Sequence, residues 1–414
     1  MTTKNNIPVG YKDSAVGVIP QEWEVTTLGK LVSITSGESP SLYDLQSSGK
    51  YPYVKVEDMN NCEKYQIFSR EYSDDEKGAI PKGSIIFPKR GAAIINNKVR
   101  IADCALYMDS NMMAITPNEY VCGDYLYFKI TFEKLYKIAD TSTIPQINNK
   151  HIIPYKLAVP PMGEQRKIAE ILGVWDEAIE KQSRLIERLE VRKRALMQRL
   201  LTGRTRLPGF TTPWQKIKLG EIGTITSAGV DKKINDGEVP VRLLNFVDVF
   251  YRDFLYDNEL EHWVTAKPVK VAQCSIQKGD IFFTPSSETP TDIALSAVAM
   301  EDMPDAVYSY HIVRLRPHID MDLRYRAYAF KTDEFYKQAE RICDGSGQRY
   351  VISQNGFRSM EIHLPSLPEQ KAIAEVLTAA DNEIATHRKK LDALRHQKRG
   401  LMQQLLTGKT RVKI

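Results

Sequence analysis

Two loops in the first half of the chain concentrate Lys, Arg, Asn, Gln, Ser and Thr side chains. The first is FPKRGAAIINNKVR (residues 87–100), and the second is DTSTIPQINNKH (residues 140–151). Arg and Lys suit guanine and phosphate, Asn and Gln suit adenine, and Ser and Thr bond to any base. The candidates are Lys89, Arg90, Asn96, Asn97, Lys98, Arg100, Ser142, Thr143, Gln146, Asn148, Asn149 and Lys150. Because Asn also favours turns, turn formation is the alternative role of the two Asn-Asn pairs.

Matching places in the second half carry FTPSSETPTD (residues 283–292) and DGSGQRYVISQNGF (residues 344–357). The candidates there are Thr284, Ser286, Ser287, Thr289, Ser346, Gln348, Arg349, Tyr350, Ser353, Gln354 and Asn355. Arg349 suits a phosphate, and the neighbouring Tyr350 suits stacking on a sugar edge. Lys55 and Arg242 lie on two further matching strands and are candidates for holding a phosphate backbone, with ordinary surface charge as the alternative.

Motifs for catalysis are absent from the sequence. LTGKT, which ends at Thr410, lacks the earlier Gly of a phosphate loop because Gln403 stands there, and it follows a helix instead of starting one. We find no glycine-rich nucleotide fold, no Asn/Asp-Pro-Pro-aromatic stretch and no carboxylate–lysine nuclease motif. The seven histidines are dispersed. We therefore expect no catalytic residue, no metal site and no cofactor bound by this chain itself.

Composition indicates a soluble, cytoplasmic protein of two domains. The chain has 414 residues, no apolar run long enough for a membrane, and five scattered cysteines without a CxxC pair, which is typical of reduced thiols. The net charge is +5, of which residues 164–206 and 369–413 together supply +9. The remainder therefore sums to −4, and any basic footprint on the globular parts must be local.

The strongest pattern is a duplication. LMQRLLTG (residues 196–203) returns as LMQQLLTG (residues 401–408), and an offset of 205 aligns 20 identities in 44 positions without a gap. Each copy has the 4,3 apolar spacing of a coiled-coil seam. The seam residues are Ile168, Leu172, Trp175, Ile179, Ile186, Leu189, Leu196, Leu200, Ile373, Leu377, Ile384, Leu391, Leu394, Leu401 and Leu405. Ala380 replaces the Trp of the first copy.

These two helices are predicted to pack on each other. Lys193 and Lys398 interrupt the seam at matching places, as residues that fix register do, and Gly203 and Gly408 suit left-handed helix ends. Ser366-x-x-Glu369 predicts a capping box. If antiparallel, 37 helical residues would form a rod of about 55 Å with a globular segment at each end. The alternative is that each helix packs only on its own domain.

A fainter repeat surrounds the helices. Trp23 and Leu28-Gly29 match Trp214 and Leu219-Gly220 by position, and short β-branched runs recur in the same order, with helical stretches near residues 120–139 and 324–341. We predict an α/β protein with these bounds: a first globular domain over 1–160, a helix over 161–206, a second domain over 207–365 and a helix over 366–414.

This layout resembles the specificity subunit of type I restriction–modification systems. The likeness rests on VGVIPQEWEVTTLG and LPGFTTPWQKIKLG, on the KGSI and KGDI strands, and on the two EQ…LLTG helices, and it covers nearly the whole chain. It implies two target-recognition domains, each reading one half of a split double-stranded DNA sequence. It further implies an antiparallel, pseudo-twofold coiled coil that spaces the two domains and seats two methyltransferase subunits.

The same resemblance implies that S-adenosylmethionine, ATP and Mg²⁺ belong to partner methyltransferase and restriction–translocase subunits. Two alternatives remain at this stage. One is a coiled-coil scaffold without DNA readout, and the other is the detached recognition module of a single-chain restriction enzyme. A scaffold would show no sequence preference at moderate salt, whereas specific readout persists as a ratio of affinities.

Overall fold

The computed structural model describes residues 7–76, 78–142, 144–227, 229–347 and 349–413. Two compact units are present: a first unit of residues 1–183 with 390–414, and a second unit of residues 184–389. The long helices α3 (Met162–Leu200) and α10 (Leu367–Leu406) each contribute residues to both units. The periodic repeat predicted both helices, and that prediction is confirmed.

The first unit is built on a five-stranded sheet in the order β4-β11-β8-β9-β6. The strands are β4 (Val32–Ser36), β11 (Met112–Pro117), β8 (Ile85–Pro88), β9 (Arg100–Ala102) and β6 (Tyr65–Gln66). Only the β6–β9 pair of this sheet is parallel. In β8, Ile85 and Phe87 pack into a core with helices, whereas Ile86 packs into a core on the opposite face. A strand covered on both faces needs a continuous apolar run, which explains IIFP.

The second unit repeats this sheet in the order β14-β23-β19-β21-β16. Its strands are β14 (Gly223–Thr226), β23 (Val313–Pro317), β19 (Ile281–Phe283), β21 (Ser296–Ala299) and β16 (Phe254–Leu255). The β16–β21 pair is parallel and the other pairs are antiparallel, as in the first unit. Ile281 and Phe283 face one core and Phe282 faces the other. The sheet topology is therefore duplicated although the sequences between the anchors diverge.

Smaller sheets complete each unit. They are β10-β5-β7, β12-β3 and β1-β2 in the first unit, and β17-β15-β22-β18, β13-β26 and β20-β25-β24 in the second. The bounds in the first unit are β1 (Tyr11–Lys12), β2 (Ile19–Pro20), β3 (Glu24–Thr27), β5 (Tyr51–Val54), β7 (Tyr72–Ser73), β10 (Tyr107–Met108) and β12 (Lys156–Val159). Those in the second are β13 (Gln215–Lys218), β15 (Val239–Leu244), β17 (Trp263–Ala266), β18 (Ser275–Ile276), β20 (Ser286–Ser287), β22 (Met303–Tyr308), β24 (Asp344–Ser346), β25 (Arg349–Val351) and β26 (Glu361–Leu364). Each unit is thus a mixed α and β structure.

The shorter helices differ in number between the two units. They are α1 (Gly123–Glu133) and α2 (Asn149–Ile152) in the first unit, and α4 (Leu219–Ile222), α5 (Phe246–Tyr251), α6 (Pro268–Gln273), α7 (Leu323–Tyr328), α8 (Asp333–Ile342) and α9 (Gln354–Ser359) in the second. The helices α1, α7 and α8 lie within the stretches predicted to be helical. Among the described residues, no helix is long and apolar enough to span a membrane.

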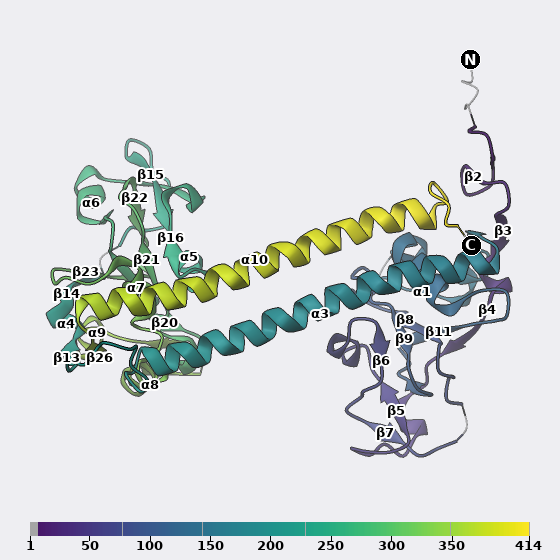
Figure 1. The fold of residues 1–414 in the computed structure, drawn as a ribbon, viewed down its shortest axis with the longest axis horizontal. Coiled ribbons are helices and arrows are strands. Elements are labelled where there is room, and N and C mark those ends of the chain that lie inside the picture. Colours follow the sequence, from purple (N-terminus) through teal and green to yellow (C-terminus); the bar gives the residue numbers. More distant parts are fainter. Residues whose placement is uncertain (1–6, 77, 143, 228, 348, 414) are drawn as a thin grey trace. The chain divides into compact units, whose positions relative to one another are not determined.

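Within each unit the two long helices pack antiparallel. In the first unit, Ile168 and Leu172 near the start of α3 share a core with Met402 and Leu405 near the end of α10. Figure 1 shows these helix segments beside α1. In the second unit, the end of α3 shares a core with the start of α10, for example Leu200 with Leu377. The predicted seam residues are buried, except for five that are half-buried: Trp175, Ile179, Leu196, Leu394 and Leu401.

A Lys–Asp pair recurs between the helices of each unit. Lys398 of α10 contacts Asp176 of α3 in the first unit, and Lys193 of α3 contacts Asp381 of α10 in the second. Each ammonium also lies over an aromatic ring, Lys398 over Phe128 at 5.2 Å and Lys193 over a tyrosine ring at 5.7 Å. A half-buried ion pair forms in only one alignment of the helices, which supports the predicted register role of the two lysines.

A buried glutamate organises the start of each long helix. Glu164, which is fully buried, accepts from Trp23 Nε1 at 3.0 Å and from the Arg411 guanidinium at 2.8 and 3.0 Å. Glu369 is likewise fully buried, and its carboxylate accepts from the Trp214 indole and from Arg206. We call each Trp–Glu–Arg group a helix junction. Ser366 directly precedes α10, where the sequence predicts a capping box, and the Glu369 carboxylate belongs to this junction. The capping box itself stays a prediction.

Both predicted glycine ends are confirmed. Gly203 and Gly408 have φ of 69° and 73°, in the left-handed region that favours glycine. At Gly408, an added Cβ would come within 2.5 Å of Pro20. The chain past α10 therefore turns tightly onto the first unit, where Tyr11 donates to the Gly408 carbonyl oxygen at 2.9 Å.

Candidate nucleic-acid interface

In the first unit, the backbone joins the two loops that the sequence singled out. The Ile147 N–H donates to the Lys89 carbonyl oxygen at 2.9 Å, and the Gly91 N–H donates to the Pro145 carbonyl oxygen at 2.9 Å. Arg90 and Gln146 form a β-bridge. We call the surface made by residues 89–91, 109–111 and 145–148 the first platform. It lies where β8 ends and shortly before α2 begins.

The turn Asp109–Asn111 of this platform was not predicted from the sequence. Its Asn111 carbonyl oxygen accepts from the Lys89 N–H at 2.8 Å, which ties the turn to the end of β8. A Cβ at Gly37 would lie 2.0 Å from the Asp109 carbonyl oxygen, so only glycine fits beside the turn. The one sequence signal was the recurrence of Gly37 and Gly229 after matching Ile-Thr-Ser runs.

Two cations of the first platform carry no intramolecular ion pair in the part of the chain that the structure describes. Arg90 is exposed and Lys89 is half-buried. Burial, with a smaller contribution from Arg90, lowers the pKa of Lys89, while Asp109 opposes that shift. An incompletely solvated ammonium without a counterion is well suited to a phosphate.

Several other candidates of the first half are engaged within the unit. Asn97 has φ of 49° and donates through Nδ2 to the Thr131 carbonyl oxygen at 2.9 Å, so it forms a turn. Arg100 donates to the carbonyl oxygens of Cys62 and Met59 at 2.8 and 3.0 Å. The remaining contacts join Lys98 to Asn60, and Lys55 to Glu71. These four side chains hold the loops in place, which leaves them few free donors.

The remaining first-half candidates lie around α2. Asn148 is the N-cap residue of α2, and its N–H donates to His151 Nδ1 at 3.2 Å. Asn149 and Lys150 open the helix and are exposed, as are Asn96 and Ser142. Thr143 lies outside the described residues.

In the second unit, the same backbone connection recurs with other side chains. The Ile352 N–H donates to the Pro285 carbonyl oxygen at 2.8 Å, and β20 pairs with β25 through Ser286–Val351 and Ser287–Tyr350. We call the surface made by residues 285–287, 309–311 and 349–353 the second platform. The predicted candidates Ser286, Ser287, Arg349, Tyr350 and Ser353 all belong to it.

The turn Ser309–His311 of the second platform was also missed from the sequence. A Cβ at Gly229 would lie 2.3 Å from the Ser309 carbonyl carbon. The Tyr310 ring, 48% exposed, packs on the His311 ring with centroids 3.8 Å apart. Burial lowers the pKa of His311, and the nearby charges of Lys232 and Arg349 lower it further, against an opposing contribution from Asp231.

Other second-half candidates are engaged or buried. Thr284 is fully buried and its Oγ1 accepts from the Leu295 N–H at 3.0 Å, so this candidate is not exposed to a DNA base. Arg242 donates to the carbonyl oxygen and Oδ2 of Asp257, each at 2.7 Å.

Thr289 donates to Asp292 at 2.8 Å, and Gln354 donates to the Ile225 carbonyl oxygen. Ser353 caps α9 by accepting from the Gly356 N–H at 3.0 Å. Ser346 and Asn355 are exposed, and Gln348 lies outside the described residues. The short polar side chains of this half therefore serve mainly as caps and turn contacts.

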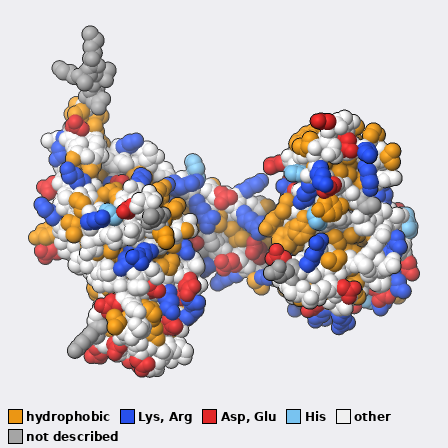
Figure 2. All heavy atoms as spheres, turned by 180° about the vertical axis from the view of Figure 1, so that it is seen from behind, with side chains coloured by type: hydrophobic (Ala, Val, Ile, Leu, Met, Phe, Trp, Pro, Cys, Tyr) orange, Lys and Arg blue, Asp and Glu red, His pale blue; other side chains and the backbone are white. Residues whose placement is uncertain are grey.

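Charge is local on both units. In the face seen in Figure 2, positive and negative side chains are interspersed over each unit without one extended basic area. This agrees with the net −4 of the chain outside the helical repeats. Lys89 and Arg90, which have no ion pair among the residues that the structure describes, therefore form a small basic site.

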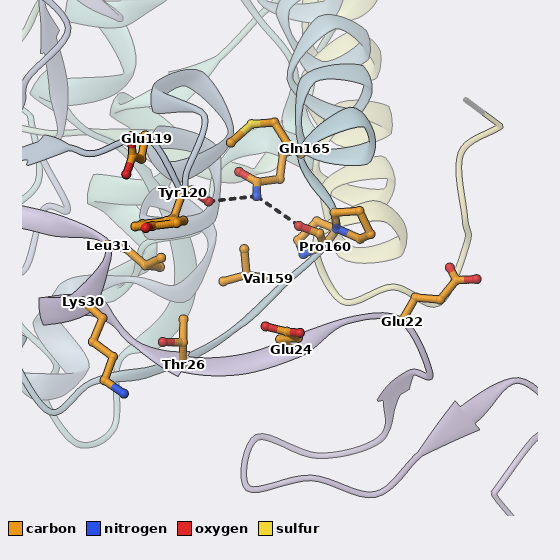
Figure 3. Close-up of a pocket in the computed structure, with 12 residues that line it drawn as sticks. Glu22, Glu24, Thr26, Lys30, Leu31, Glu119, Tyr120, Val159, Pro160 and Gln165 are labelled. Atoms are coloured by element: carbon orange, nitrogen blue, oxygen red, sulfur yellow. Dashed lines mark hydrogen bonds between the residues drawn. The ribbon is translucent and has the colours of Figure 1, made fainter.

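A cleft of about 660 Å³ lies apart from the predicted loops, beside the start of α3. Its lining includes Glu22, Glu24 and Glu119 (Figure 3). Gln165 at its wall is fully engaged, because Nε2 donates to the carbonyl oxygens of Pro160 and Tyr120 at 3.0 and 3.3 Å. No group of His, Cys, Asp and Glu side chains among the described residues could hold a metal ion.

A family model described as type I restriction modification DNA specificity domain matches this chain twice, over residues 20–191 and 212–396. Together these matches cover most of the sequence. The two copies fall in the two halves that the internal repeat and the duplicated sheets define.

Similar proteins and structures agree with that match. The type I restriction enzyme MjaVIII specificity subunit of Methanocaldococcus jannaschii is 24% identical, with 95% of this chain and 94% of that protein covered. The putative MjaX specificity subunit of the same organism is 26% identical, with 97% of each covered.

Two solved structures share the fold at 15% sequence identity. The first is a chain from a structure of the assembly and conformational transition of a type I R-M system, with a TM-score of 0.63 and coverage of 95% and 99%. The second is the S subunit of a type I restriction–modification system from M. genitalium, with a TM-score of 0.52 and coverage of 100% and 99%.

Proposed function

This chain belongs to the family of type I restriction–modification DNA specificity subunits, and we propose that its two platforms each read one half of a bipartite DNA target. The assignment of DNA reading to the platforms rests on one observation. In both units the N–H before a short helix bonds the carbonyl oxygen after the central strand, Ile147 with Lys89 and Ile352 with Pro285. The scaffold is thus repeated where the exposed side chains differ, as two readers of different half-sites require.

In this proposal the cations and the polar groups of the platforms contact different parts of the DNA. Lys89, Arg90 and Arg349, which form no ion pair within the described parts of the chain, bind phosphates and set the affinity. Gln146, Asn149 and Lys150 near the first platform, and Ser286, Ser287 and Tyr350 on the second, contact bases or sugars. The side chains of Asn97, Arg100 and Arg242 act indirectly, by holding these loops.

The long helices serve as a spacer. We propose an antiparallel, pseudo-twofold coiled coil between recognition domains at residues 1–160 and 207–365, formed by residues 161–206 and 366–414. The antiparallel cores, the two Lys–Asp pairs and the two helix junctions support it. Such a rod fixes the number of unread base pairs between the half-sites, and its surface docks two methyltransferase subunits.

Catalysis resides with the partners in this proposal. The methyltransferase subunits bind S-adenosylmethionine, restriction–translocase subunits use ATP and Mg²⁺, and the complex works on DNA in the cytoplasm. Family membership gives no support to a scaffold without DNA readout, and the curated relatives of matching length are separate specificity subunits.

The test is co-expression with a candidate methyltransferase subunit, followed by mapping of methylated adenines. We expect one bipartite motif that disappears when this chain is omitted. A second arm exchanges residues 1–160 for those of another family member and should change one half-site only. Methylation without a split motif, or a motif independent of this chain, would contradict the proposal.

A further inference from the structure

We propose that the turns Asp109–Asn111 and Ser309–His311 determine which bases the two platforms read, and that Tyr310 and His311 contact the bases of the second half-site. This inference rests on the proposed function. It names determinants that lie outside the loops selected by composition, because each turn is only three residues long and the second presents Tyr310 and His311.

The backbones of the two turns are held alike. Gly37 and Gly229 approach them so closely that an added Cβ would lie 2.0 and 2.3 Å from backbone atoms. In the second unit, the Tyr310 N–H donates to the Val230 carbonyl oxygen at 3.1 Å, and the Val230 N–H donates to the Tyr308 carbonyl oxygen at 2.9 Å. In the first, the Glu38 N–H donates to the Met108 carbonyl oxygen at 2.9 Å. Because the backbone at this position is rigid, the turn loses little conformational entropy when its side chains bind DNA.

The side chains on this common backbone differ in chemistry. Ser110 and Asn111 precede β11, and Tyr310 and His311 occupy the same places before β23. Asn111 is exposed and its amide is the type that pairs with adenine, although Nδ2 donates to Asp109 at 2.9 Å. The second turn instead offers an aromatic surface and an imidazole. Different half-sites follow from such a difference at equivalent positions.

The second turn is preorganised for a nucleotide. The Tyr310 and His311 rings pack at 3.8 Å with an angle of 38°, so each restrains the other. Burial, and then the nearby positive charges of Lys232 and Arg349, lower the pKa of His311 against an opposing contribution from Asp231, which favours the neutral imidazole. A neutral imidazole offers one donor and one acceptor to a base edge. Lys232 and Arg349 are exposed, with Arg349 in no ion pair among the described residues, and they suit the flanking phosphates.

The experiment uses the complete complex with its methyltransferase subunits. The double variant Tyr310→Ser/His311→Asn gives the second turn the side chains of the first. We expect the methylated motif to change or relax at the second half-site, with discrimination falling by about tenfold or more, and to stay the same at the first. The reciprocal variant Ser110→Tyr/Asn111→His should affect the first half-site only.

The matched control is Tyr251→Ser, which removes a 79% exposed aromatic side chain of the second unit outside the platform. It should leave the motif unchanged. If the double variant does not form a folded complex, His311→Gln alone carries the test at the same half-site. An unchanged motif and unchanged discrimination in the folded variants would overturn the inference. Failure of the wild-type complex to methylate any split motif would instead overturn the proposed function.

Discussion

The helix junctions and the platform turns are both duplicated, but the two copies agree in one case and differ in the other. Glu164 and Glu369 are both fully buried, and each accepts from a tryptophan indole and an arginine. The platform turns share a backbone position but carry Ser-Asn in one unit and Tyr-His in the other. Side chains that fix the scaffold are therefore kept between the copies, and side chains that face outward diverge.

The junctions also show a small difference. Arg411 contacts a second carboxylate, Glu22, whereas Arg206 donates to the Thr212 carbonyl oxygen at 2.9 Å and lies over the Trp214 ring at 5.7 Å. One unit receives its arginine from the end of the chain, and the other receives it from the segment between α3 and β13. The chemistry at the carboxylate is nevertheless the same.

The largest effect is expected in the paired helix cores. Leu172 and Leu377 occupy equivalent places and are both fully buried. Leu172→Ala and Leu377→Ala should each lower the free energy of unfolding of their unit by about 3 kcal/mol, because each leaves a cavity. Hydrogen exchange measured by mass spectrometry localises the loss to one unit. Val174→Ala, at a side chain 62% exposed, is the control and should change stability by less than about 0.5 kcal/mol. Different losses of unfolding free energy for Leu172→Ala and Leu377→Ala would show that the two cores are not equivalent.

The helix junctions come next. Arg206→Met and Arg411→Met remove the cation from a buried carboxylate and should each cost about 2 kcal/mol, below the 3–5 kcal/mol of fully buried pairs because the arginines are partly exposed. Increased hydrogen exchange should appear in the second unit for Arg206→Met and in the first for Arg411→Met.

Arg204→Met is the matched control for the junctions, since Arg204 is exposed two residues before Arg206. A loss as large as that of Arg206→Met would show that general surface charge, and not the junction, stabilises the unit.

A smaller effect, on the salt dependence of DNA affinity, distinguishes the platform lysine Lys89 from Lys98, which contacts another side chain. Lys89→Ala removes one phosphate contact and should reduce the slope of log affinity against log salt by about 0.9. Lys98→Ala removes a lysine that contacts Asn60 and should leave the slope nearly unchanged. Fluorescence anisotropy with the target duplex at several salt concentrations measures both. Equal slopes for the two variants would contradict the distinction.

The smallest effect concerns pH. The pKa of His311 is lowered in the folded protein from its ordinary value of 6.5, so the unfolded state binds the proton more readily. Its contribution to stability is therefore complete above about pH 6.5 and is lost as the pH falls from there through the lower pKa of the folded state. The thermal midpoint of the wild type should fall more than that of His311→Asn between pH 8 and pH 5. Parallel curves of thermal midpoint against pH for the two proteins would show that the pKa of His311 is the same in the folded and unfolded states.

The sequence by itself determined what repeats over short or regular distances. The 205-residue offset, the seam spacing and the glycine ends predicted α3, α10 and the left-handed ends, because local geometry sets helix periodicity and termination. The loop composition also predicted part of the first platform, since Lys89, Arg90, Gln146 and Asn148 are candidates from the sequence alone.

Only the tertiary structure decided which polar side chains are free. Asn97, Arg100 and Arg242 have the composition of a reader but bond within their own unit, and Thr284 is buried. Glu369 binds Trp214 and Arg206, two partners that its position at the start of the helix did not indicate. The turn at Tyr310 and His311 is held against Gly229 and Val230, about 80 residues earlier in the chain. Hydrogen-bond partners and burial depend on such long-range contacts, which residue type and spacing do not specify.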